Sequence, residues 1–249
     1  MNAAANGAAG QSFPESGDGA EAPEGHLMSE SMPHTALPQT VVFAGPSISK
    51  EEISSILPGA EVRPPVRRGD AAAAAQDGAR LIVIIDGVFF QDEAVAHKEL
   101  LGVMKGGVKV FGASSMGALR ACELEPFGMT GIGKIFEWYR SGKIAADDEV
   151  GMLFDPETGT ALSVPMVNMR ASFEKAKGAG VLTADEERAL LKACKGIYYP
   201  ERTYRRVVKE ADIPAETKDT LTRWLKEHAA DQKHEDAAAC LAHVRGLYD

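Results

Sequence analysis

Short apolar runs alternate with amphipathic segments through the first half of the chain. The run RLIVIIDGVF is apolar almost throughout and bounded by turn residues, as expected of a strand buried on both faces. Apolar residues at helical spacing follow each extended run, and several of these segments stop at glycine. The pattern predicts four strand–helix pairs, with strands at 40–45, 60–66, 80–89 and 108–114 and helices at 48–57, 69–79, 92–107 and 115–125.

This alternation predicts an α/β fold with a parallel sheet and flanking helices, followed by a mostly helical C-terminal subdomain. Ser49 with Glu52, and Thr183 with Glu186, are spaced as capping boxes that begin helices. We therefore divide the chain into a disordered acidic tail, an α/β core and a helical subdomain, at residues 1–39, 40–168 and 169–249.

The tail takes its acidic character from five carboxylates and has no lysine or arginine within the first 40 residues. Since the whole chain carries −9, about −4 is left for the rest. A segment this poor in large apolar residues cannot bury enough surface to offset its ordering entropy. The acidic balance argues against nonspecific nucleic-acid binding.

Targeting signals and membrane spans are not expected. The longest apolar run, residues 81–90, is far shorter than the ~20 residues that a span needs. The beginning of the sequence lacks the basic and apolar regions of a secretory signal. Three widely spaced cysteines favour a reducing compartment, so we expect a cytoplasmic protein.

The loops that follow three predicted strands carry the residues of interest. Ligands of parallel α/β sheets bind beyond the carboxyl ends of the strands. That rule places GPS (45–47), DGVF (86–89) and GASSMG (112–117) along one edge of the sheet.

Ser115 is the first candidate for chemistry at this edge. Ala113 and Gly117 flank it at the two positions where a strand–turn–helix nucleophile elbow needs small residues. Ser114 is also available, but Met116 stands two positions after it. A helix cap or an anion-binding turn explains the same residues, so three interpretations stay open.

His97 and Asp86 are the candidate partners of a serine nucleophile. His97 is the histidine that falls inside the predicted α/β core, and a solvated surface position is its alternative. Asp86 interrupts an apolar strand, where an unpaired carboxylate would be costly. It either serves the site or caps the turn at Gly87.

Two charged motifs have less specific interpretations. Arg67 and Arg68 could hold a carboxylate or phosphate, or form an ordinary surface pair. The run DDEV (147–150) suggests either a cation patch or a helix N-terminus. No histidine–cysteine ligand cluster and no complete phosphate loop occur, so we predict no metal and no cofactor.

Several longer sequence motifs show that the chain resembles the TfuA-like family. Seven motifs occur in a fixed order between about Val41 and Val150, namely FAGPS, PPVRRGD, IIDGVF, HKE, VFGASSMGALRACEL, FGMTGIGKIFEWYRSG and DDEV. Weaker similarity continues through NMR (168–170) and YYPERTY (198–204).

The resemblance implies a function beside an ATP-dependent YcaO enzyme that makes backbone thioamides in peptides. The expected role is hydrolysis of the C-terminal thiocarboxylate of a ThiS-like sulfur carrier protein, which supplies sulfide to YcaO. The precursor peptide is a further candidate partner. Neither nucleic acid nor a membrane is expected as a partner.

The residues fit such acyl transfer to water in a definite way. Ser115 would attack the thiocarboxyl carbon, with His97 as base and Asp86 orienting it. In an alternative mechanism the turn binds the thiocarboxylate, and Asp86 or His97 directs water without a covalent serine. The remaining predicted substrate-binding residues are Ser114 and Gly117 in the turn and Arg67, Arg68 and Arg120 for the anionic end.

Two other functions compete with this hydrolase. One is a non-catalytic adaptor that docks the carrier or peptide onto YcaO, with Tyr198, Tyr199 and Trp224 as anchors. The other is a nucleotide-binding protein, which would show affinity for ATP.

Overall fold

The structure, a computed structural model, describes residues 37–89, 93–155, 158 and 160–248. The predicted tail therefore lies outside the described residues up to position 36. The first strand starts at Thr40, where the sequence predicts a strand.

Within the described residues, the strands form one five-stranded sheet in which every neighbouring pair is parallel, as predicted. The strand order is β2-β1-β3-β4-β5. The strands are β1 (Thr40–Phe43), β2 (Glu61–Arg63), β3 (Leu81–Ile84), β4 (Lys109–Ala113) and β5 (Thr130–Ile132). The glycine-rich segment that contains β5 carries no strand signal, so the sequence did not predict β5.

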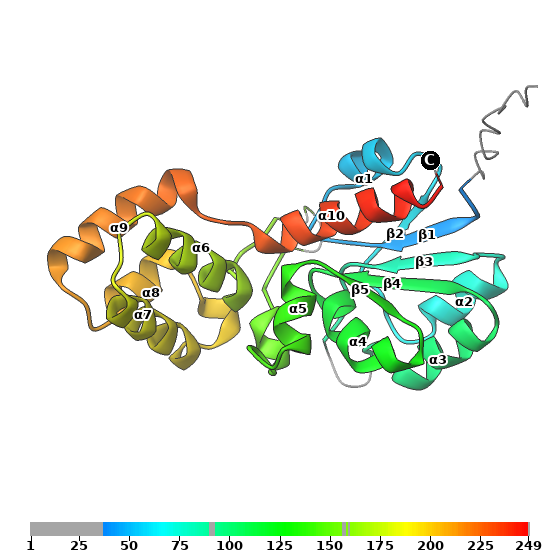
Figure 1. Ribbon diagram of the computed structural model, residues 1–249, viewed down its shortest axis with the longest axis horizontal. Helices are drawn as coiled ribbons and strands as arrows, with labels where there is room; N and C mark the ends of the chain where they lie inside the picture. The colour runs from blue at the N-terminus through cyan, green and yellow to red at the C-terminus, as the bar shows by residue number, and fades with distance from the viewer. Residues whose placement is uncertain (1–36, 90–92, 156–157, 159, 249) are drawn as a thin grey trace, which may run out of the picture. The chain divides into compact units, whose positions relative to one another are not determined.

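Helices cover both faces of the sheet (Figure 1). One face packs against α2, α3, α4 and α5, and the side chains of Phe43, Ile82 and Ile84 point into that layer. The opposite face, which carries Val42, Val83 and Ile85, packs against α1 and α10. The helices of these layers are α1 (Lys50–Ile56), α2 (Asp70–Gln76), α3 (His97–Lys105), α4 (Met116–Leu124), α5 (Lys134–Arg140) and α10 (Gln232–Gly246).

Four further helices form a bundle with its own apolar core, in agreement with the predicted helical region. Met169, Phe173, Leu190 and Leu221 are fully buried there. The bundle consists of α6 (Met166–Gly178), α7 (Ala184–Gly196), α8 (Tyr204–Glu210) and α9 (Ala215–His228). Of the helices in the described part, none is both long and apolar enough to span a membrane.

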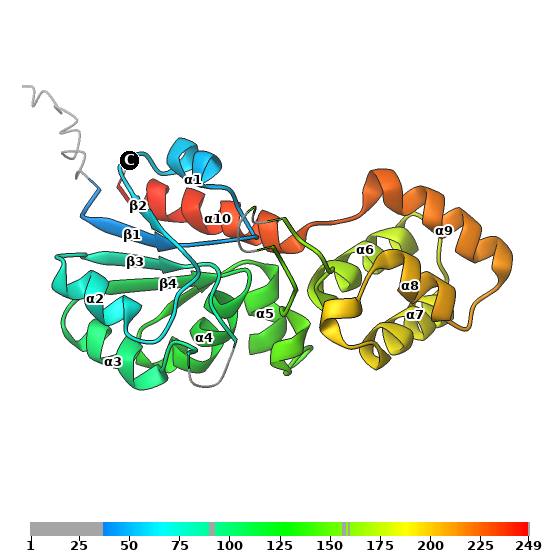
Figure 2. The same cartoon turned by 180° about the vertical axis from the view of Figure 1, so that it is seen from behind.

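The last helix, α10, corrects the predicted grouping of the C-terminal helices. The sequence assigned residues 233–247 to the helical subdomain, but their apolar stripe packs on the sheet (Figures 1 and 2). Ala237, Cys240, Leu241 and Val244 of α10 are fully buried there. A stripe at helical spacing shows that a helix has a buried side, but not which core receives that side. As a result, α10 brings its first turn to the edge of the sheet.

Candidate functional site

Asp86 joins the loops at the carboxyl edge of the sheet. It follows β3, and its carboxylate accepts hydrogen bonds from the Gly45 amide (2.9 Å), the Ser47 amide (3.1 Å) and the Ser47 hydroxyl (2.7 Å). These donors lie in the loop after β1, so the predicted meeting of the two loops is confirmed. Because β2 lies on the other side of β1 from β3, this is the switch point of a doubly wound sheet.

The same contacts bear on nucleotide binding. In many doubly wound proteins, the amides of a loop at the switch point hold the phosphates of a ligand. Here the amides of Gly45 and Ser47 already donate to the protein's own carboxylate. This arrangement favours an internal brace for the loop over a phosphate site.

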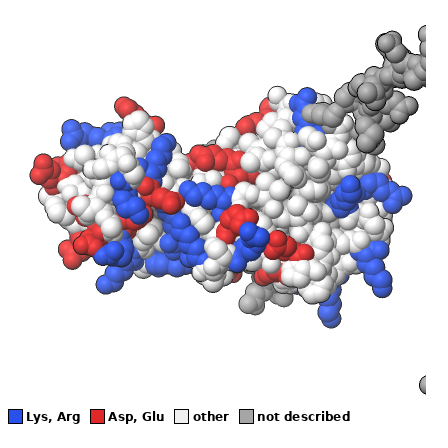
Figure 3. Space-filling model, viewed as in Figure 1, with Lys and Arg blue, Asp and Glu red and all other residues white. Residues whose placement is uncertain are grey.

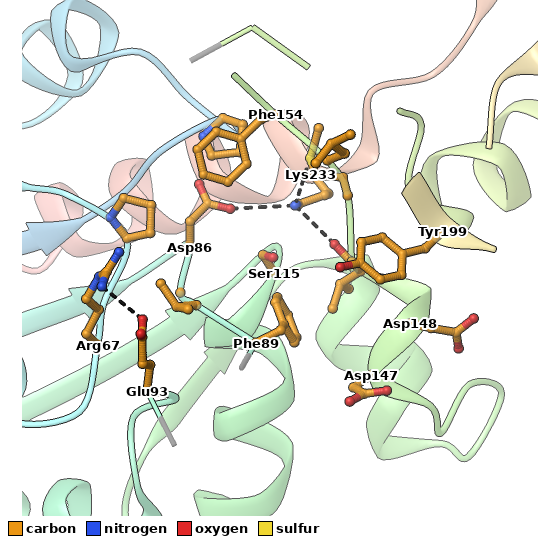
Figure 4. Close-up of a pocket in the computed structure, with 18 residues that line it drawn as sticks. Arg67, Asp86, Phe89, Glu93, Ser115, Asp147, Asp148, Phe154, Tyr199 and Lys233 are labelled. Carbon is orange, nitrogen blue, oxygen red and sulfur yellow. Dashed lines mark hydrogen bonds and ion pairs between the residues drawn. The ribbon is translucent and has the colours of Figure 1, made fainter. Parts of the chain in front are cut away.

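A cavity of about 400 Å³ opens beside Asp86 (Figure 4). Its walls come from the loops after β1, β2, β3 and β4, from residues 147–154, from Tyr199 and from α10. Ser115 and Asp86, both predicted as catalytic residues, line this cavity together. Arg67, predicted to bind substrate, lines it as well.

Lys233, on the first turn of α10, is a cavity residue that sequence reasoning missed. The residue is only 2% exposed. Its Nζ donates to the carbonyl oxygen of Val150 (3.3 Å), contacts Met152 Sδ (3.3 Å) and lies 3.6 Å from Asp86 Oδ1. Figure 4 shows the Asp86–Lys233 pair with Ser115 drawn below it. A lone lysine in a polar helical stretch carries no sequence signal of this placement.

Burial decides the protonation behaviour of Lys233. Removal from water lowers the pKa of its ammonium group, and the charges of Asp86 and Asp231 only partly oppose this effect. A lysine in such surroundings has more neutral amine at a given pH than an exposed lysine. That is the property required of a proton acceptor beside a serine.

The turn between β4 and α4 has an unusual backbone. The Ser115 amide donates to the carbonyl of Ala113 at 2.8 Å, and the intervening residue Ser114 has φ = 66°. These features are those of a γ-turn with positive φ, which is rare and strained. The Ser114 hydroxyl is buried and has no hydrogen-bond partner. The cavity is thus lined by Ser115, whereas Ser114 lies in the interior.

Gly117, which the sequence predicts to bind substrate, has a role in packing. A Cβ at Gly117 would lie 1.7 Å from the carbonyl oxygen of Ile84, so glycine lets α4 approach the sheet closely. The amides of Ser115 and Gly117 both donate to the carbonyl of Ile85 at 3.3 Å. Met116 is the first residue of α4, and the backbone amides of the first helical turn have no partner within a helix. The Met116 amide is therefore a candidate hydrogen-bond donor to an oxyanion.

His97 and Arg120 are not among the residues that line the cavity. His97 begins α3, its side chain is 48% exposed, and its Nε2 lies 2.8 Å from Glu123 Oε2. Arg120 donates to the same carboxylate (2.6 Å) and to the carbonyl of Val95 (3.1 Å). The structure therefore does not bring His97 to Ser115 or Arg120 to the site, because both side chains are directed to Glu123.

The two consecutive arginines have different surroundings. Arg67 forms an exposed ion pair with Glu93 (2.9 Å) at the cavity. The backbone amide of Arg68 donates to the carbonyl of Glu93 (2.7 Å), and Arg68 is not a lining residue. Of this pair, only Arg67 lines the cavity.

Two DDEV carboxylates, Asp148 and Glu149, contact cations of the helical bundle. They lie in the short helix η2 (Asp147–Glu149). Asp148 accepts from Lys195 (2.7 Å) and Arg202 (2.5 Å), and the buried Glu149 binds Arg170 through two hydrogen bonds (2.8 and 2.9 Å). Partial burial acts to raise the pKa of Asp148, but these hydrogen bonds hold it below its ordinary value. Among the described residues, no group of three histidine, cysteine or acidic side chains could hold a metal ion.

The fold and the site define a doubly wound α/β protein whose cavity, at the switch point, contains a serine at a strained turn and a buried lysine. Residues 86–203 match the family model of TfuA-like proteins, the family that the sequence motifs resemble. At the level of that family, the match supports a role in thioamidation with YcaO enzymes. The matched region begins at Asp86 and includes Ser115, whereas Lys233 lies beyond it. No curated protein sequence matches the chain.

Proposed function

We propose that the protein hydrolyses the C-terminal thiocarboxylate of a ThiS-like sulfur carrier protein and so delivers sulfide to a YcaO enzyme. The observation that carries the proposal is the presence of Ser115 and the buried Lys233 in the walls of one cavity. A serine beside a lysine of lowered pKa is suited to acyl transfer. All three cysteines are unpaired, which suits a reducing, cytoplasmic setting.

In the proposed reaction, Ser115 Oγ attacks the thiocarboxyl carbon while its proton passes to the neutral amine of Lys233. The carbon–sulfur bond then breaks, Lys233 passes the serine proton to the departing sulfur, which leaves as HS⁻, and an acyl ester forms on Ser115. Water attacks this ester while the again neutral Lys233 takes a proton from the water and passes it to Ser115 Oγ. The carboxylic acid leaves and ionises to the carboxylate. Lys233 thereby replaces His97 as the proposed base.

The other cavity residues support these steps. Asp86 Oδ1 lies 3.6 Å from Lys233 Nζ and positions this amine, and Asp86 is itself braced by the loop after β1. Arg67 is exposed at the cavity and can exchange Glu93 for the anionic end of the carrier. Met116 follows Ser115 at the start of α4, and its amide is the proposed donor to the developing oxyanion.

Sulfide release from a thiocarboxylated carrier, measured without YcaO, tests the proposal. We expect Ser115→Ala to lower the rate by at least ~10³-fold, the size of effect seen when a nucleophile is removed. His97→Ala serves as the control, because His97 does not line the cavity, and we expect it to keep most of the rate. A wild-type rate in Ser115→Ala would rule out the covalent mechanism.

An adaptor function is the second candidate, and one observation favours it. Tyr198 is 66% exposed and stacks edge-on against Tyr199, which lines the cavity. Exposed aromatic residues of this kind anchor protein contacts. If the wild type releases no sulfide but brings the carrier to YcaO in a pull-down assay, the protein is an adaptor.

A further inference from the structure

The cavity is larger and more apolar than the leaving group of the proposed reaction requires. Its volume of about 400 Å³ falls within the range of small-molecule sites, whereas HS⁻ has one heavy atom. Its wall includes the apolar or aromatic side chains of Val88, Phe89, Met152, Leu153, Phe154 and Tyr199. The acyl side of the substrate is therefore the part that these walls can hold.

The polar groups of the cavity are mostly engaged with other protein groups. Asp86 is held by Ser47 and Lys233, Asp148 by Lys195 and Arg202. The apolar walls offer few hydrogen-bond partners, so they favour the part of a substrate that has few polar groups. An acyl chain has no polar group beyond its carbonyl and can therefore lie against these walls.

We infer that the site also hydrolyses small acyl esters and thioesters, with the acyl chain bound on these apolar walls. The inference rests on the proposed function for the roles of Ser115 and Lys233. Ser115 Oγ bonds to the carbonyl carbon, the bond to the alkoxide or thiolate breaks, and Lys233 passes the serine proton to that leaving group. Water then releases the acid and restores Ser115.

The length of the acyl chain makes the inference quantitative. Burial of each additional methylene contributes enough transfer free energy to raise kcat/KM roughly 4-fold. The increase continues until the chain fills the cavity and then stops. Val88 stands in the wall next to Gly87, so a larger side chain at this position shortens the longest acyl chain accepted.

The test uses the full chain and p-nitrophenyl acetate, butyrate, hexanoate and octanoate. We expect kcat/KM to rise along this series in the wild type and to vanish in Ser115→Ala. Val88→Trp moves the optimum to a shorter ester, and Leu153→Trp, at a more exposed wall position, does the same if Val88→Trp fails to fold. Phe127→Ala is the matched control, because Phe127 is 62% exposed and lies outside the cavity.

The outcomes separate this inference from the proposed function. Sulfide release without any Ser115-dependent ester hydrolysis overturns the inference alone. Ester hydrolysis without sulfide release supports the inference and overturns the proposed carrier substrate. Ester hydrolysis that is independent of chain length and unchanged by both tryptophan variants also overturns it, because the apolar walls would then not bind the acyl group.

Discussion

At the scale of single residues, two side chains and one backbone angle distinguish this site. Ser115 and Lys233 lie far apart in the sequence, and α10 brings the lysine into the cavity that Ser115 lines. The positive φ of Ser114 belongs to the turn that presents Ser115. Each feature has its own consequence for rate or stability.

The protonation of Lys233 should govern the pH dependence of sulfide release. The proposed base is the neutral amine, and burial lowers the pKa of Lys233 below 10.5. The wild-type rate therefore rises with pH, with a midpoint below that of an ordinary lysine. Lys233→Met should lose roughly 10²–10⁴-fold in rate, the usual contribution of a general base, and should lose this rising limb. A mutant rate with the wild-type pH profile would exclude Lys233 as the base.

The strain at Ser114 should be visible in stability. Glycine adopts φ = 66° without the steric cost that serine bears, although it adds freedom to the unfolded chain. We expect Ser114→Gly to raise the free energy of unfolding by roughly 0.5–1 kcal/mol. Denaturant unfolding measures this difference. Ser114→Ala, which keeps the positive φ, is the control and should not gain from relieved strain; a destabilised glycine variant would argue against strain at this turn.

At the scale of elements, the sequence predicts the strands well and the placement of helices less well. Apolar runs with turn residues at their ends identify the regions of β1 to β4, and the rule for parallel sheets brings Asp86 and Ser115 to one edge. The predicted helix at 92–107 begins later, at His97, where the side chain is directed to Glu123. Helical periodicity does not show which core α10 packs against, so the position of Lys233 in the cavity could not be predicted from it.

Close contact between α4 and β3 depends on glycine at position 117. A Cβ there would lie 1.7 Å from the Ile84 carbonyl oxygen, and backbone must move to admit it. We expect Gly117→Ala to cost about 3 kcal/mol, at the upper end of overpacking effects. Gly102→Ala in α3 is the matched control, since nothing lies within 4 Å of its added Cβ. That variant should gain up to ~1 kcal/mol in helix propensity.

At the scale of the whole molecule, charged pairs connect the cavity wall to the helical bundle. Glu149 is buried and binds Arg170 of α6, and Lys195 of α7 lies 3.0 Å from the same carboxylate. Arg202 extends the network to Asp148. Elsewhere on the bundle, acidic and basic side chains are interspersed over the face seen in Figure 3. Exposed ion pairs contribute little to the free energy of unfolding, so we test the buried pair of Glu149 and Arg170.

Removal of one partner from this buried pair should destabilise more than removal of both. Arg170→Met leaves the Glu149 carboxylate with Lys195 as its remaining cation, and we expect a loss of about 3 kcal/mol in unfolding free energy. Glu149→Gln combined with Arg170→Met removes the uncompensated charge, so the double variant should recover part of that loss. Denaturant unfolding of both single variants and the double variant gives the coupling free energy. If the two single losses simply add, Glu149 and Arg170 are not coupled, and their ion pair does not hold η2 against the bundle.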